Sequence, residues 1–372
     1  MVQSISKVRI LFILVLFSWG LSADIYSQET RAEVRFSDYP FLPFYEWKKL
    51  KHPEIFQGNR REDKYFEGWY FKMVSGVNSG ILSVIPGISI SEDGEEQHAF
   101  IQLIDGNTTE TWYFRFPIED FYFSTADFAV RIGPNYFSAD RLFLDLDQDG
   151  MQVKGEVLMG DKVAWPSAGV LNPGIMGWYR YVPFMQCYHG VVSMDHSLSG
   201  KINLGGKNYI FDKGRGYIEK DWGSSMPSSW IWIQTNHFET PGISFMLSVA
   251  DVPWLGKSFT GFLGFFLKDG EVYNFASYTG AKLLFDSTSE SKINLRILDS
   301  QHEYIVEAYR DGSGVLLAPS LGSMDRRISE SIQAKLVLTI KDLKGKELYK
   351  GSSAVTGLEL VGDLRALKDN LK

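Results

Sequence analysis

The chain has 372 residues, of which 44% are hydrophobic and 15% aromatic, so it can bury a substantial core and is long enough for two domains. Its formal net charge of −7 falls to −9 if the first 23 residues are removed, because these carry Lys7 and Arg9 and no acidic residue. An acidic chain repels phosphate backbones, so we do not expect a nucleic-acid partner.

The N-terminal residues have the pattern of a secretory signal. Lys7 and Arg9 precede an uninterrupted apolar run over 10–17, and the segment 18–23 that follows ends in the small residues Ser22 and Ala23. This run is shorter than the roughly 20 residues needed to cross a bilayer. The pattern predicts a cleaved signal over 1–23 and export to the periplasm or the exterior, with an uncleaved anchor as the alternative. The single cysteine, Cys187, excludes an internal disulfide.

Beyond residue 24 the sequence predicts one short strand after another. Segments 242–249 and 335–340 are rich in β-branched or aromatic residues and are bounded by turn residues. Asp149-Gly150 and Asp269-Gly270 each lie between alternating apolar runs, which predicts hairpins. Helical periodicity is found only at the end, where Leu364, Leu367 and Leu371 share a face. We therefore expect an all-β sandwich or barrel with a short C-terminal helix.

A faint internal repeat indicates how the strands are divided. The segments 69–71 and 230–232 are both aromatic strands, and each is followed by a turn and a strand that ends in Leu-Ser-Val. This similarity favours a duplicated β lobe. We predict one lobe over 24–205 and a second over 206–372, with the boundary in the turn-rich stretch around 199–207.

No pattern in the sequence favours a metal-binding or nucleotide-binding site. The aspartates between Asp145 and Asp149, with Glu156, have the spacing of a calcium loop, but the alternating residues around them favour a plain hairpin. His189 and His196 lack metal-ligand spacing, and no phosphate-binding loop is present. We expect neither a metal nor a cofactor, and no obligate protein partner is evident.

Two segments place carboxylates among aromatic rings. They are 65–72 (YFEGWYFK) and 214–223 (GRGYIEKDWG), and the second leads into 230–237. An acid in an apolar site has a raised pKa and can donate a proton near neutrality, while ring faces stabilise a resulting carbocation. The alternative is structural, with Glu67 and Glu219 paired to Arg215 or Lys220 and the rings in the core. Residue types alone favour that alternative.

These two segments, together with 174–190 and 193–200, resemble the tocopherol cyclase family. The resemblance extends from about His52 to the segment 357–360. It implies an all-β fold of two lipocalin-like (calycin-type) antiparallel lobes, related to the carotenoid 1,2-hydratases. It also implies a reaction without a cofactor, in which a prenyl double bond of a prenylated quinol is protonated and a phenolic oxygen closes a chromanol ring.

The resemblance assigns roles to particular residues. Glu219 aligns with the proton donor of the related hydratases, whereas Asp221 stands where the family more often has Asn. The candidate catalytic residues are Glu219, Asp221 and Glu67. The candidate substrate-binding residues are Trp69, Tyr70, Tyr217, Trp222, Trp230, Trp232 and His237.

Three functions remain open at this point. The first is cyclisation of a prenylated aromatic, the second is hydration of a carotenoid-like or other isoprenoid alkene, and the third is binding of an apolar ligand without chemistry. Each implies a small apolar isoprenoid or prenylated aromatic ligand, which is compatible with peripheral association with a membrane.

Overall fold

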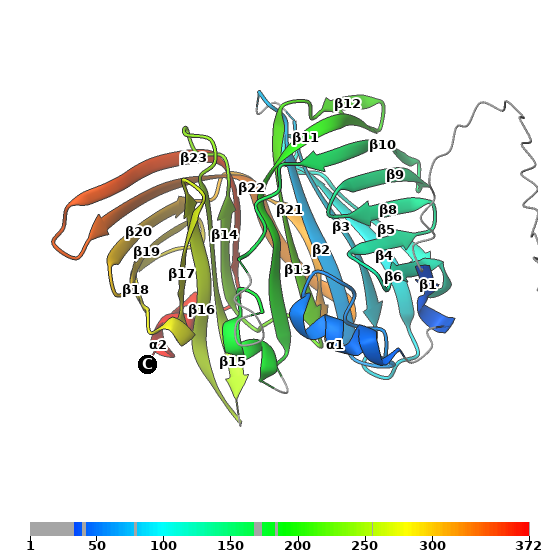
Figure 1. Ribbon diagram of the computed structural model, residues 1–372, viewed down its shortest axis with the longest axis horizontal. Helices are drawn as coiled ribbons and strands as arrows, with labels where there is room; N and C mark the ends of the chain where they lie inside the picture. The colour runs from blue at the N-terminus through cyan, green and yellow to red at the C-terminus, as the bar shows by residue number, and fades with distance from the viewer. Residues whose placement is uncertain are drawn as a thin grey trace, which may run out of the picture. The chain divides into compact units, whose positions relative to one another are not determined.

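The structure, a computed structural model, describes residues 33–38, 42–77, 80–166, 173–182, 185–254 and 256–371. The predicted signal over 1–23 lies outside these residues. Two antiparallel sheets account for nearly all of the described regular structure (Figure 1). The predicted all-β class with two lipocalin-like antiparallel lobes and a short C-terminal helix is therefore confirmed. Among the described residues, no helix is both long enough and apolar enough to span a membrane.

The first sheet has 13 strands in the order β1-β6-β7-β8-β9-β10-β11-β13-β2-β3-β4-β5, with β12 paired to β11. Its strands are β1 (Glu33–Arg35), β2 (Tyr65–Val74), β3 (Ile81–Ile90), β4 (Gln97–Asp105), β5 (Thr111–Pro117), β6 (Phe121–Ser124), β7 (Ala129–Ile132), β8 (Asn135–Ser138), β9 (Arg141–Gln148), β10 (Met151–Gly160), β11 (Cys187–Leu204), β12 (Lys207–Ile210) and β13 (Gly214–Gly223).

The second sheet has 10 strands in the order β17-β16-β15-β14-β23-β22-β20-β19-β18, with β21 paired to β22. Its strands are β14 (Trp230–Thr235), β15 (Ser244–Trp254), β16 (Lys257–Lys268), β17 (Glu271–Ala276), β18 (Lys282–Thr288), β19 (Lys292–Leu298), β20 (His302–Tyr309), β21 (Gly314–Ser320), β22 (Ser323–Asp342) and β23 (Glu347–Val361).

Both predicted two-residue hairpins are confirmed. Asp149-Gly150 joins β9 to β10, and Asp269-Gly270 joins β16 to β17. All four residues have positive φ, the backbone conformation that hairpin turns of this length need. In the first hairpin, Asp145 is paired with Lys154 on the neighbouring strand, so this acidic segment is a strand surface rather than a calcium loop.

Two helices frame the sheets, and only one of them was expected. The predicted C-terminal helix α2 (Leu364–Asp369) is capped by the Asp363 carboxylate and buries Leu367 against the second lobe. Helix α1 (Pro43–Lys51) was not predicted from the sequence. It buries a single side chain, Tyr45, and therefore has no apolar stripe for a periodicity search to find.

The change of sheet does not coincide with the predicted boundary after residue 205. Strands β12 and β13 lie beyond that point but still pair within the first sheet, and the chain enters the second sheet only at Trp230. The physical reason is that β13 hydrogen-bonds along its whole length to β2, so the two aromatic segments are neighbours in one sheet.

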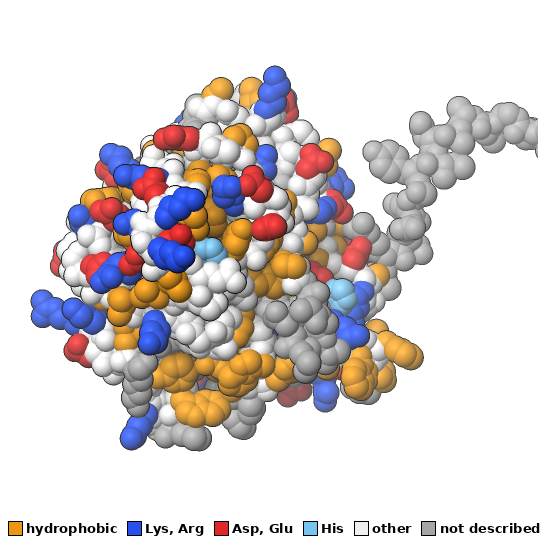
Figure 2. Space-filling view, turned by 60° about the vertical axis from the view of Figure 1, so that its left-hand side comes forward, with side chains coloured by type: hydrophobic (Ala, Val, Ile, Leu, Met, Phe, Trp, Pro, Cys, Tyr) orange, Lys and Arg blue, Asp and Glu red, His pale blue; other side chains and the backbone are white. Residues whose placement is uncertain are grey.

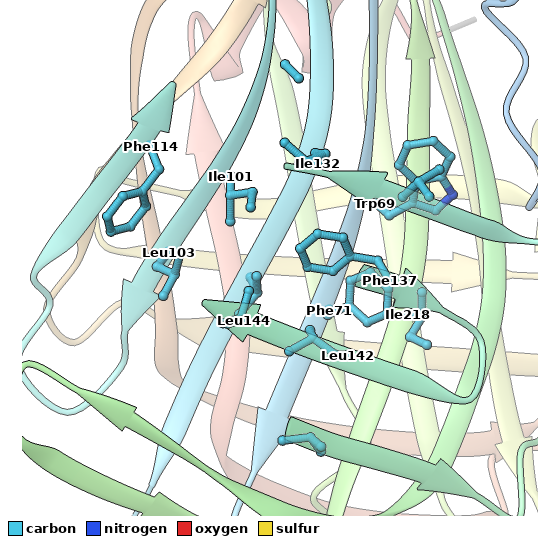
Figure 3. Close-up of a cluster of buried hydrophobic side chains, with 14 of the residues drawn as sticks. Trp69, Phe71, Ile101, Leu103, Phe114, Ile132, Phe137, Leu142, Leu144 and Ile218 are labelled. Atoms are coloured by element: carbon cyan, nitrogen blue, oxygen red, sulfur yellow. The ribbon is translucent and has the colours of Figure 1, made fainter. Parts of the chain in front are cut away.

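Each sheet curves around its own apolar core. In the first lobe, side chains such as Trp69, Phe71, Phe137 and Leu142 fill the interior (Figure 3). The second lobe has an equivalent core that includes Ile231. A third buried cluster lies between the two sheets and combines residues of both. The lobe interiors are thus packed with side chains, and space for a ligand is found between the sheets.

Candidate active site between the two sheets

A cavity of about 430 Å³ lies between the first and second sheets. Its walls are largely apolar and aromatic, with side chains from both sheets (Phe66, Tyr70, Ile85, Phe100, Trp230, Trp232, Leu263, Leu316 and Ile328). The ionisable side chains that interrupt this lining include His189, Glu219, Asp221, Glu330 and Glu359. An apolar pocket with a few convergent polar groups is the usual form of a small-molecule site.

The strand pair β2–β13 decides which of the predicted residues reach the cavity. Successive side chains of a strand point to opposite faces, and the register aligns Tyr70 with Glu219 and Trp69 with Lys220. Tyr70 and Glu219 face the cavity between the sheets. Trp69 and Lys220 face the interior of the first lobe, where Trp69 belongs to the core.

Glu219 is buried and is held by hydrogen bonds from both sheets. The Tyr217 hydroxyl donates to its Oε2 at 2.6 Å, and the Trp232 indole N–H donates to the same atom at 3.2 Å. Burial raises the pKa of Glu219 to about 7; the positive charge of His189 opposes this shift and the negative charge of Asp221 adds to it. The side chain can therefore carry a proton at neutral pH and present it to the cavity.

His189 connects Glu219 to Asp221. Its Nδ1 lies 2.9 Å from the Asp221 carboxylate and its Nε2 lies 3.5 Å from Glu219 Oε2. Burial lowers the pKa of His189, but the two carboxylates more than offset this effect and raise it to about 9. The Asp221 side chain is 28% exposed. A protonated His189 paired with Asp221 thus lies between the buried acid and the exposed end of the site.

Glu67 lies on the face of the strand pair β2–β13 that points away from the cavity, and its contacts there are with other groups of the protein. It lies 2.5 Å from the Lys220 ammonium, and both side chains are fully buried. The Tyr65 hydroxyl and the backbone N–H groups of Gln57 and Gly58 also donate to it. Since these donors use its oxygens and it does not line the cavity, the predicted catalytic role of Glu67 requires correction.

Two of the predicted ligand-binding rings enclose Lys220 instead. The Lys220 ammonium lies 4.8 Å from the ring centroid of Trp69 and 4.8 Å from that of Trp222. Neither tryptophan lines the cavity. They stabilise a buried cation through their ring faces, so the structural alternative considered for these segments applies to Glu67, Trp69 and Trp222. It does not apply to Glu219, which pairs with neither Arg215 nor Lys220 in the described structure.

Of the other predicted ligand-binding residues, some line the cavity, one positions Glu219 and one lies away from the cavity. Tyr70, Trp230 and Trp232 line the cavity. Tyr217 does not line it but positions Glu219. His237 is not at the cavity, and burial lowers its pKa to about 3, with Lys72 and Arg215 adding to the shift.

Sequence inspection missed three charged residues of the site. Glu330 on β22 and Glu359 on β23 line the cavity and are cross-strand neighbours. Lys72 on β2 is fully buried and donates to backbone and side-chain oxygens of the second sheet. Glu330 is flanked at alternate positions by the buried Ile328 and Ile332, and an acid on an apolar strand face was the available signal.

His189, Glu219 and Asp221 also merit consideration as metal ligands. Their nearest ligand atoms lie within 4.8 Å of one another, which the sequence could not reveal because His189 comes from β11 and the acids from β13. A nitrogen and two carboxylates are ligands that a divalent ion accepts. However, Glu219 Oε2 already accepts hydrogen bonds from Tyr217 and Trp232, so the oxygen nearest His189 is engaged by donors of the protein itself.

Comparisons with known proteins identify the family. The sequence profile of the family described as Tocopherol cyclase-like matches residues 145–362. The chain is 29% identical over 111 residues to the chloroplastic tocopherol cyclase of Zea mays, covering 28% of this chain and 23% of that protein. It is 27% identical over 121 residues to a probable chloroplastic tocopherol cyclase of Oryza sativa subsp. japonica, covering 31% and 26%. The aligned region thus spans about a quarter of the length of these relatives.

Solved structures extend the likeness to the fold. A crystal structure of CghA superposes with a TM-score of 0.52 at 9% identity, covering 80% of this chain and 89% of that one. The same protein with Sch210972 gives a TM-score of 0.50 at 8% identity with the same coverage. At such identities the likeness concerns the fold alone. Since the family profile covers more than half of the sequence, the chain belongs to the tocopherol cyclase-like family.

Proposed function

We propose that this protein is an acid catalyst that protonates a double bond of an isoprenoid chain and closes a ring on a prenylated quinol. The observation that carries the proposal is the Glu219 carboxyl group, which is directed into an aromatic-lined cavity and has a pKa raised to about 7. Family membership supports the same class of reaction. No step of this mechanism needs a cofactor.

The proposed reaction conserves every atom of the substrate. The O–H bond of Glu219 breaks as a new C–H bond forms at the less substituted alkene carbon, leaving a tertiary cation. The phenolic oxygen then forms a C–O bond to the cation and releases its proton. Trp232 and Tyr70 line the cavity, with ring centroids 5.2 Å apart, and ring faces presented to the cavity can stabilise the transient positive charge.

His189 is suited to return a proton to Glu219 after each turnover. After Glu219 loses its proton, the His189 Nε2–H lies 3.5 Å from the new carboxylate and is the nearest cationic donor. Asp221 holds the other ring nitrogen and is itself partly exposed, so protons can return from solvent along this pair. In this scheme Asp221 is a positioning residue, and Glu219 is the group that touches the substrate.

Hydration of an isoprenoid alkene is the second candidate. The partly exposed Asp221–His189 pair favours it, because such a pair can hold a water molecule beside the cation. The experiment that tests both is incubation of the purified protein with a prenylated quinol at neutral pH, followed by mass analysis. Cyclisation leaves the mass unchanged, hydration adds one water, and recovery of unchanged open-chain substrate would reject both reactions.

We also propose that the protein acts outside the cytoplasm, at a membrane surface that holds its apolar substrate. Trp178 and Trp254 line the cavity and are 54% and 43% exposed, as expected of rings at a bilayer interface. Hydrophobic side chains also gather at the lower edge of the face in Figure 2. Recovery of the native protein with residues 1–23 still attached, or in the cytoplasm, would reject the proposed export.

A further inference from the structure

Glu330 projects into the cavity from the second sheet, whereas Glu219 enters from the first. It is fully buried, and its Oε1 accepts a hydrogen bond of 2.5 Å from the Tyr70 hydroxyl. Its Oε2 is buried and has no hydrogen-bond partner among the described residues. A buried carboxylate oxygen without a donor is uncommon in folded proteins and indicates that a donor comes from outside the chain.

Burial and the groups around Glu330 act on its ionisation in opposite directions. Burial raises the pKa of Glu330 to about 7, while the Tyr70 hydrogen bond and the positive charge of Lys72 oppose this shift and the negative charge of Glu219 adds to it. Lys72 is itself fully buried, and burial lowers its pKa to about 7, while the negative charges of Glu330 and Glu219 oppose this shift. The Tyr70 hydroxyl and the Lys72 side chain thus favour the carboxylate form of Glu330 against the effect of burial.

Glu359, the cross-strand neighbour of Glu330, differs from it in its hydrogen bonding and in its pKa. The Trp230 indole N–H donates to its Oε2. Burial holds its pKa well above the usual range, and the charges of Glu330, Glu219 and Asp221 add to the shift. Burial thus disfavours the ionised form of Glu359, and Glu330 is the member of this pair whose Oε2 lacks a hydrogen-bond partner among the described residues.

We propose that Glu330 is the general base that accepts the proton of the attacking hydroxyl group. This inference rests on the proposed function, in which Glu219 supplies the first proton. The O–H bond of the nucleophile breaks as its oxygen bonds to the cation, and the proton passes to Glu330 Oε2. One proton leaves Glu219 and one arrives at Glu330, so the pair is restored when Glu330 releases its proton and Glu219 regains one.

The proposal defines the ligand class more narrowly than the apolar lining does. The substrate must bring an alkene to Glu219 and a hydroxyl group to Glu330 at the same time, so it carries a phenolic or alcoholic oxygen a few bonds from the double bond. A hydrocarbon without such an oxygen would leave Glu330 Oε2 unpaired, and the site would discriminate against it for that reason.

The test is turnover of a prenylated quinol in D₂O, with ring closure and deuterium in the recovered open-chain substrate measured separately. In Glu330→Gln we expect ring closure to fall about 100-fold or more. Deuterium should still enter the open chain, because protonation by Glu219 continues and the cation reverts. Glu219→Gln should lose both signals. Glu359→Gln, the matched control, should lose less ring closure than Glu330→Gln.

Several outcomes would overturn the proposal. Ring closure at the native rate in Glu330→Gln, or equal loss of both signals there, would remove Glu330 as the base while the proposed function stands. Absence of both signals in the native protein would reject the proposed function and this inference with it. If Glu330→Gln does not fold, Tyr70→Phe decides the matter: loss of its hydrogen bond should raise the pKa of Glu330 and move the acid limb of the rate profile to higher pH.

Discussion

The two faces of the strand pair β2–β13 use similar residues for different purposes. On the face toward the first lobe, Glu67 and Lys220 form a closed ion pair between two tryptophans. On the face toward the second sheet, Glu219 has hydrogen-bond donors but no partner lysine or arginine, and it borders open space. A buried carboxylate that is fully paired stabilises the fold, whereas one that is left partly unpaired can exchange a proton with a ligand.

The largest expected effect comes from removing the acidic proton of Glu219, which lies on the face that borders the cavity. Glu219→Gln keeps the shape of the side chain but has no acidic proton, so turnover should fall by about 10²–10⁴-fold. Apolar ligand binding, followed by fluorescence of Trp230 and Trp232, should persist. Asp221→Asn is the control and should lose far less. Full activity in Glu219→Gln, or a larger loss in Asp221→Asn, would contradict the assignment.

On the opposite face of the strand pair β2–β13, we expect substitutions to change the free energy of unfolding. Lys220→Met leaves the Glu67 carboxylate buried without its cation, and breaking a buried pair costs about 3–5 kcal/mol. Urea unfolding should reveal this loss. The double variant Lys220→Met with Glu67→Leu should recover part of it, because no unpaired charge then remains. A stability unchanged by Lys220→Met would show that the pair does not hold this face together.

The dependence of turnover on pH should reflect the ionisation of the residues that face the cavity, and not that of the Glu67–Lys220 pair. Since Glu219 must be protonated to act and its pKa is about 7, turnover should fall as the pH rises through that value. His189→Gln removes the positive charge that opposes the raised pKa. The fall should then move to higher pH, measured as the midpoint of kcat against pH. A midpoint that stays in place or moves to lower pH would disprove this coupling.

The smallest expected effect is that of a chelator. EDTA should leave turnover unchanged, because a protonated Glu219 acts without a metal. Excess Zn²⁺ should inhibit by occupying His189, Glu219 and Asp221, which are close enough to share an ion. Activity that EDTA abolishes and a metal restores would instead make this cluster a metal centre.

The sequence was sufficient for the class of fold, and it singled out the proposed acid, because each depends on residues close together in the chain. Asp149-Gly150 and Asp269-Gly270 predict hairpins through their own backbone preferences. Glu219 was marked by its aromatic neighbours and by its resemblance to a known motif. Helix α1 left no such mark, since it buries only Tyr45.

The division of the site between two faces could not be predicted, because it depends on register. Glu219 and Lys220 are adjacent in sequence but point in opposite directions, and only the pairing of β13 with β2 shows that Lys220 belongs to Glu67. Glu330 lies 260 residues from Tyr70, its hydrogen-bond donor. No local pattern records a contact of that separation, so the second carboxylate had to come from the structure.

The position of the cavity between the sheets links its occupancy to the cooperativity of unfolding. Since each sheet supplies part of the wall, unfolding of either lobe destroys the binding site. By mass action, a ligand at 100 times its dissociation constant stabilises the folded state by about 2.7 kcal/mol. An occupied cavity therefore makes the two lobes melt together, and the Tm of the purified protein will vary with the apolar molecule it carries.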